Sequence, residues 1–107
     1  HQVDSNRTLW TGEFDHVAVH KAIRSASPGL NACYLEEVKS NPNAVGNITV
    51  QIEMYSSKKA HSSKIIGSTM HTSQAFQQCI LSILQNADFP KSKTDKATVG
   101  YSIVFAP

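Results

Sequence analysis

The sequence has no long apolar run and few charged residues, and both absences exclude classes of protein. Among its 107 residues, no apolar stretch approaches the ~18 residues that are needed to cross a bilayer. The net charge is only +2 and no run of basic residues occurs, which argues against a nucleic-acid-binding protein. With 40% hydrophobic and 17% charged residues, the chain is typical of one globular domain rather than of a disordered protein.

The sequence also lacks the motifs that mark a catalytic or cofactor site. Neither glycine-rich phosphate-binding pattern, GxGxxG or GxxxxGK, occurs, and the absence of a CxxC pair argues against a zinc ribbon or a thioredoxin motif. His16 and His20 lie four residues apart on an expected helix, where both rings can reach one metal ion, but no third ligand follows at a set spacing. We therefore predict no catalytic residue, no metal ligand and no bound cofactor.

What the sequence does contain is a clear helix followed by a clear strand. Ser27 is a good N-cap and Pro28 suits the first helical position, which predicts a helix over residues 28–40. Residues 47–55 then alternate between apolar and polar, which is typical of a strand with one buried face. The inward residues of this strand are Ile48, Val50, Ile52 and Met54.

The rest of the chain predicts a small α+β domain. Residues 1–11 are polar and irregular, so we expect a flexible N-terminal tail with Trp10 docked on the core. One domain then spans residues 12–107, in which Ser27-Pro28 separates the first two helices. The order of helix, helix, strand, strand, helix and strand predicts a three-stranded antiparallel sheet with helices packed on one face. The further elements are helices over residues 16–26 and from Thr72 or Ser73 to about Asn86, and strands over residues 60–68 and 97–105.

The two cysteines fall on the inward faces of the two main predicted helices. In a small domain they fit either a single bridge or two buried thiols, and Cys33 and Cys79 can meet if those helices pack side by side. A Cys-His hydrolase needs an accessible thiolate beside an imidazole, whereas an apolar face raises the pKa of a thiol and hides it. Catalysis by cysteine is therefore the least favoured interpretation.

The charged residues are expected to form solvated surfaces. Glu36 and Glu37 are neighbours on a predicted helix and point about 100° apart, so they do not share a carboxylate site. The lysines near the hairpin and the following loop form a mildly basic surface, for which attraction to an acidic partner or an anionic surface is the minor interpretation. These are Lys58, Lys59, Lys64, Lys91, Lys93 and Lys96.

The order of several residues resembles that of a known family. The chain contains Gly12-Glu13-Phe14-Asp15, Ile23-Arg24, Cys33-Tyr34, Asn41-Pro42, Gly46 before an alternating strand, Ser68, Phe76-x-x-Cys79 and Phe89-Pro90 before a terminal strand. Over residues 12–106 this order resembles the TonB C-terminal-like fold. More narrowly, it is similar to the AgmX/PglI-type C-terminal domain of bacterial envelope and gliding-motility proteins.

The resemblance implies a non-catalytic periplasmic domain of an inner-membrane-anchored bacterial protein. Such a module binds an extended segment of an outer-membrane or envelope protein by strand addition, within a complex for energy transduction, transport or motility. An oxidising periplasm favours a Cys33–Cys79 disulfide. Because the chain begins with His1 and not methionine, we expect it to be excised from a longer protein whose anchor lies upstream and makes the membrane contact. The alternative is a structural or oligomerisation domain, such as a homodimer.

The residues and the resemblance together place partner binding on the last strand. That strand follows the last helix and no later strand covers it, so we expect one open edge. Gly100 removes a side chain and lets another backbone come close, while Lys93 and Lys96 discourage uncontrolled pairing. In TonB-like domains the partner segment adds at the corresponding strand. The predicted partner-binding residues are Thr98, Val99, Gly100, Tyr101, Ser102, Ile103 and Val104.

Overall fold

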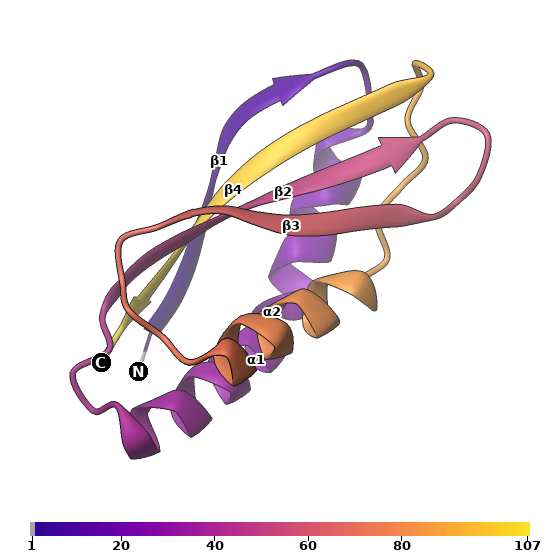
Figure 1. Ribbon diagram of the computed structural model, residues 1–107. Helices are drawn as coiled ribbons and strands as arrows, with labels where there is room; N and C mark the ends of the chain where they lie inside the picture. The colour runs from indigo at the N-terminus through magenta and orange to yellow at the C-terminus, as the bar shows by residue number, and fades with distance from the viewer. Residues whose placement is uncertain (1) are drawn as a thin grey trace.

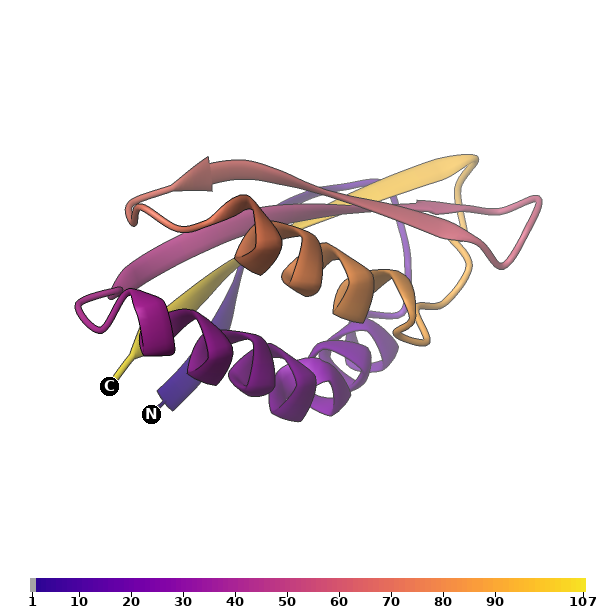
Figure 2. The ribbon, with the colours of Figure 1, turned by 60° about the horizontal axis from the view of Figure 1, so that its bottom comes forward.

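The computed structural model describes residues 2–107 and arranges them as four strands and two helices. The strands form one antiparallel sheet in the order β1-β4-β2-β3 (Figure 1). Both helices lie on the same face of this sheet (Figure 2). The predicted α+β class is confirmed, with four strands in the described chain where three were expected. In chain order the elements are β1 (Gln2–Thr11), α1 (His16–Ser40), β2 (Gly46–Tyr55), β3 (His61–Ser68), α2 (Gln74–Gln85) and β4 (Lys96–Ala106).

The core lies between the helices and the two central strands. The register places Ile48 opposite Ile103 and Ile52 opposite Val99, so the alternating patterns of β2 and β4 turn their apolar side chains to the same face. Each large aliphatic or aromatic side chain buried there contributes about 1.5–3 kcal/mol to stability. The polar side chains of both strands fall on the other face, which is open to solvent. The buried residues are Ile48, Val50, Ile52, Met54, Ala97, Val99, Tyr101, Ile103 and Phe105.

An aromatic cluster fixes both helices over β4. The ring of Phe105 lies 5.3 Å from that of Tyr34 on α1 and 5.2 Å from that of Phe76 on α2. The hydroxyl of Tyr34 donates a hydrogen bond of 2.5 Å to the carbonyl of Ala44, so its polar end is satisfied inside the core. Burial raises the pKa of Tyr34.

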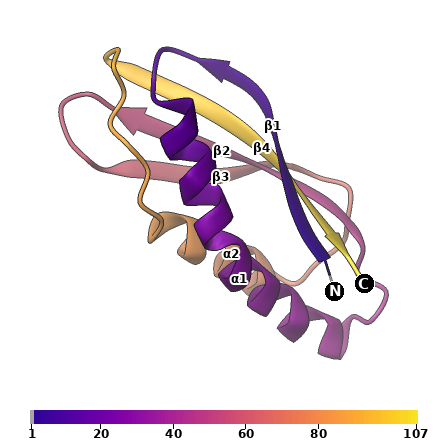
Figure 3. The same cartoon turned by 180° about the vertical axis from the view of Figure 1, so that it is seen from behind.

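The two helices predicted on either side of Ser27-Pro28 are one continuous helix, and that prediction is wrong. Asp15 caps α1 by accepting a 3.1 Å hydrogen bond from the N–H of Ala18, and the helix then continues through Pro28. The missing N–H of a proline bends a helix rather than ending it when the residues on both sides are buried against one core. α1 changes direction near its middle in Figure 1 and Figure 3.

Residues 2–11 form strand β1, so the prediction of a flexible tail over residues 1–11 is wrong where the structure describes them. Position 1 lies outside the described residues. β1 pairs with β4 from Gln2 opposite Ala106 to Thr11 opposite Thr98. A polar segment becomes a strand here because main-chain pairing supplies its stability, while most of its side chains stay exposed. Trp10 is 46% exposed and is not docked in the core.

The remaining predicted elements are confirmed. β3 occupies the predicted second strand, and α2 begins after Ser73, whose side chain accepts a hydrogen bond of 3.1 Å from the N–H of Phe76. A Cys33–Cys79 disulfide joins α1 to α2 with a Cα–Cα distance of 5.9 Å. No helix within residues 2–107 is both long enough and apolar enough to span a membrane.

Candidate partner-binding surfaces

The residues predicted to bind a partner all lie on β4, inside the sheet. Residues 98–104 pair with residues 47–53 of β2 on one side. On the other side they face residues 4–11 of β1. The prediction of an open edge on β4 is therefore wrong, because the segment interpreted as a tail supplies the missing neighbour. With β1 in place, the main-chain groups of β4 are used within the chain.

Gly100 does allow a close backbone approach, but the approaching backbone belongs to the same chain. The pairing of β1 with β4 shifts register between Arg7 and Trp10, so Thr8 and Leu9 together stand opposite Gly100. Two residues opposite one make a β-bulge. A Cβ atom at Gly100 would clash with the hydroxyl of Thr8. The Thr8 side chain in the bulge of β1 therefore favours glycine at position 100.

Within the described chain, the free edges of the sheet belong to β1 and β3. A strand paired on one side leaves alternate N–H and C=O groups pointing away from the sheet. β1 pairs with β4 without interruption over residues 2–7. A bulge in β3 limits its uninterrupted pairing with β2 to residues 61–65. Helix contacts do not distinguish the two edges, because α2 contacts β3 and α1 contacts β1. The outer edge of β1 is thus the longer site at which an additional strand can pair.

β1 and α1 meet at a corner that exposes large apolar side chains beside cationic ones. At this β1–α1 corner, Leu9, Trp10 and Val17 are 87%, 46% and 77% exposed. The guanidinium carbon of Arg7 lies 4.3 Å from the centroid of the Trp10 ring, a cation–π contact. Arg7 also donates a hydrogen bond of 2.6 Å to Nδ1 of His16. Exposed apolar side chains around one such corner make it a candidate interaction surface.

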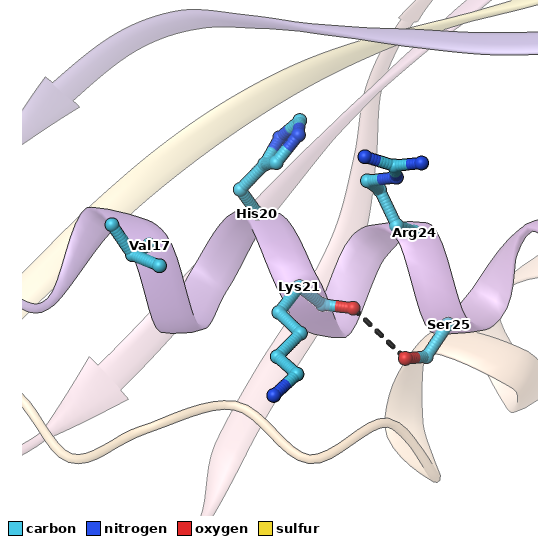
Figure 4. A pocket seen from close by; sticks show the side chains of 5 residues that line it. All are labelled: Val17, His20, Lys21, Arg24 and Ser25. Atoms are coloured by element: carbon cyan, nitrogen blue, oxygen red, sulfur yellow. Dashed lines mark hydrogen bonds between the residues drawn. The ribbon is translucent and has the colours of Figure 1, made fainter.

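His16 and His20 lie in different surroundings. The ring of His16 stacks on Phe14 at 4.1 Å and meets Trp10 edge-on at 5.1 Å, and its Nδ1 accepts the hydrogen bond from Arg7. His20 is exposed on the next turn of α1 (Figure 4). The described residues contain no group of three or more His, Cys, Asp or Glu side chains placed to hold a metal ion.

Beyond the corner, the exposed side of α1 forms a shallow hollow of about 530 Å³, which we call the α1 basic face. In Figure 4 the side chains of His20 and Arg24 project from one side of the helix and that of Lys21 from the other. The hydroxyl of Ser25 donates a hydrogen bond of 2.9 Å to the carbonyl of Lys21 and is turned back onto the helix. The hollow is lined by Val17, His20, Lys21, Arg24 and Ser25.

Glu37 is buried, so the prediction that Glu36 and Glu37 both lie on a solvated face is wrong for Glu37. Its carboxylate accepts hydrogen bonds from the Ser73 hydroxyl at 2.6 Å and the Ser73 N–H at 2.9 Å, and a longer one from Asn41 at 3.4 Å. Glu36 stays exposed and pairs with Lys39 at 2.9 Å. Glu37 thus ties the end of α1 to the start of α2, where a negative charge is favoured by the helix dipole.

The surroundings of Glu37 also set its protonation. Burial alone raises the pKa of this carboxyl, but the hydrogen bonds from Ser73 and Asn41 outweigh burial and hold the pKa below its ordinary value. The group is therefore ionised at neutral pH. Its contacts are explained by the joining of two helices, so we assign it a structural role.

The β1–α1 corner and the α1 basic face were not found from the sequence. The corner could be found only after β1 was recognised as a strand. Its inward positions are Val3, Ser5 and Arg7, and they do not give the apolar alternation that marks a strand in a sequence. The basic face had a detectable signal, since α1 carries cations but no carboxylate before Glu36. Comparison of the chain with family models, with curated proteins and with solved structures found no match.

Proposed function

We propose that this domain is a non-catalytic protein-binding module that accepts an extended segment of a partner protein by strand addition. The observation that supports this most strongly is the free outer edge of β1, with its regular stretch over residues 2–7. Main-chain hydrogen bonds to such an edge give affinity without a preformed pocket. The added segment lies beside β1 and not beside β4.

The β1–α1 corner supplies side-chain selectivity next to that edge. A segment that pairs with residues 2–7 ends beside Leu9, Trp10 and Val17, where an apolar side chain of the partner can be buried. Tryptophan and arginine are the residue types that most often dominate binding energy, and Trp10 and Arg7 are in contact here. Affinity is modest, because ordering a flexible segment offsets much of the gain.

The setting that we propose follows from the disulfide and from the family resemblance of the sequence. The Cys33–Cys79 disulfide is compatible with an extracytoplasmic location. We place the domain in the periplasm, as part of an inner-membrane-anchored protein in a complex for energy transduction, transport or motility. Its partner is then an extended segment of an outer-membrane or envelope protein.

Peptide selection followed by NMR tests strand addition at β1. A peptide selected from a displayed random library should shift the amide signals of residues 2–7 and of the corner in the ¹⁵N-labelled domain. Asp4→Pro and Ser5→Pro form a matched pair, because successive N–H groups of a strand point to opposite sides. One variant removes an outward donor, and edge strands tolerate this. That variant should fold normally and lose peptide binding, whereas the other should weaken the pairing with β4.

Two outcomes would contradict the proposal. One is unchanged peptide binding in the proline variant that keeps wild-type stability. The other is a set of chemical-shift changes confined to α1 and α2. In the oligomerisation alternative, the same edge of β1 pairs with a second copy of the chain. Light scattering distinguishes this alternative from partner binding, because the measured mass of a self-pairing domain rises with protein concentration.

A further inference from the structure

The first half of α1 carries cations without carboxylates. The helix dipole neither favours nor opposes them, because its effect falls off within the first and last turns and Lys21 lies beyond the first turn. α1 has no Asp or Glu between His16 and Leu35, whereas Lys21 and Arg24 both lie in that part. This part of α1 therefore presents positive charge without a neighbouring carboxylate on the same stretch of helix.

No salt bridge within the described chain neutralises these two cations. Lys21 and Arg24 are three residues apart and flank the hollow from opposite sides of α1 (Figure 4). The salt bridges among residues 2–107 involve Lys39, Lys59 and Lys96, and none includes Lys21 or Arg24.

The carboxylates closest in sequence do not fill this role. Asp15 is engaged as the N-cap, where its side chain accepts the N–H of Ala18 at 3.1 Å. Glu13 precedes the helix, and none of the salt bridges among residues 2–107 includes it. The α1 basic face therefore remains an exposed, unneutralised cationic surface.

We propose that the α1 basic face binds an acidic stretch of a partner protein. Carboxylates pair with Lys21 and Arg24, and a neighbouring apolar side chain contacts Val17, which is 77% exposed. Two permanent cations at one hollow suit one or two carboxylates. Nucleic acids need a longer row of cations, and anionic bilayers are recognised by clusters of about 4–8 Lys or Arg. The basic face shares Val17 with the β1–α1 corner, but Lys21 and Arg24 lie outside the corner and the edge of β1, so the proposal does not depend on strand addition.

Fluorescence anisotropy with a labelled peptide of Glu-Glu-Val repeats tests this proposal. We expect saturable binding that weakens as salt is raised. Lys21→Glu combined with Arg24→Glu should weaken binding at least about tenfold. Lys58→Glu combined with Lys64→Glu makes the same change in net charge on the β2–β3 hairpin, and should weaken binding less than about twofold. A Lys21→Gln/Arg24→Gln variant, with its fold checked by circular dichroism, keeps the test valid if the charge reversal unfolds the helix.

Three results would overturn the proposal. The first is an equal loss of binding in the two charge-reversed variants, which would indicate a response to net charge alone. The second is no saturable binding to the wild-type domain below about 1 mM peptide. The third is tighter binding to phosphatidylserine vesicles or to a single-stranded oligonucleotide, with loss in the α1 variant, which would assign the face to another class of ligand.

Discussion

Removal of the Cys33–Cys79 disulfide should destabilise the domain by about 4 kcal/mol. The two cysteines are separated by 46 positions in the chain, and closing a loop of that length in the unfolded state costs about 13–14 cal/mol/K of entropy, or about 4 kcal/mol at 25 °C. Domains are typically stable by about 5–15 kcal/mol, so the loss is a large share of the total. The packing of α1 on α2 would then rest on noncovalent contacts.

The assay compares three forms of the protein by urea unfolding. These are the oxidised wild type, the wild type under reductant, and the Cys33→Ala/Cys79→Ala variant. Loop entropy predicts a similar loss in the reduced wild type and in the variant, with a small additional cost in the variant because Cys33 is only 3% exposed and leaves a cavity. A loss below about 1 kcal/mol in both forms would refute the loop-entropy reasoning for this domain.

Two further predictions concern the contacts of β1 and of Glu37. Gly100→Ala should cost about 1–3 kcal/mol, because its methyl group meets the Thr8 hydroxyl, and adding Thr8→Ala should recover part of that loss in a double-mutant cycle. Glu37→Gln should cost about 1–3 kcal/mol at neutral pH. Because the folded pKa of Glu37 is lowered, the wild type keeps this stability above the ordinary carboxyl pKa of 4.5 and loses it as the pH falls through the folded value. The variant should lack this part of the acid dependence in melting temperature, and an unchanged pH profile would count against the Glu37 contacts.

The parts of the fold that could be predicted are those in which side chains carry the signal. Strands β2 and β4 have one buried face, so apolar residues recur at every second position from Ile48 to Met54 and from Val99 to Phe105. α2 shows both a cap at Ser73 and an apolar face. Burial on one side forces these patterns onto the sequence.

The parts that were missed depend on contacts between distant segments. β1 is stabilised mainly by main-chain pairing with β4, which leaves no apolar alternation in residues 2–11. Pro28 ends many helices, but here burial on both sides of it overrides the local preference.

The candidate site shows the same limit. Gly100 correctly indicated a close backbone approach, but the sequence could not reveal that β1 is the segment that approaches. Glu37 had a detectable signal, because it lies at helical spacing from Cys33 and Tyr34 on the buried face of α1. Its partner Ser73 could not be identified until α2 was placed beside α1.

Amide hydrogen exchange of β1 and β4, with and without a selected peptide, tests most directly the claim that β1 provides the free edge for a partner. Because β4 is paired on both sides, amides over residues 98–104 should all be protected in the free domain. Over residues 2–7, alternate amides should exchange fast, since those N–H groups point outward, and the same amides should become protected when the peptide binds. Fast exchange at alternate positions of β4, or peptide binding that leaves the exposed amides of β1 unprotected, would contradict the account.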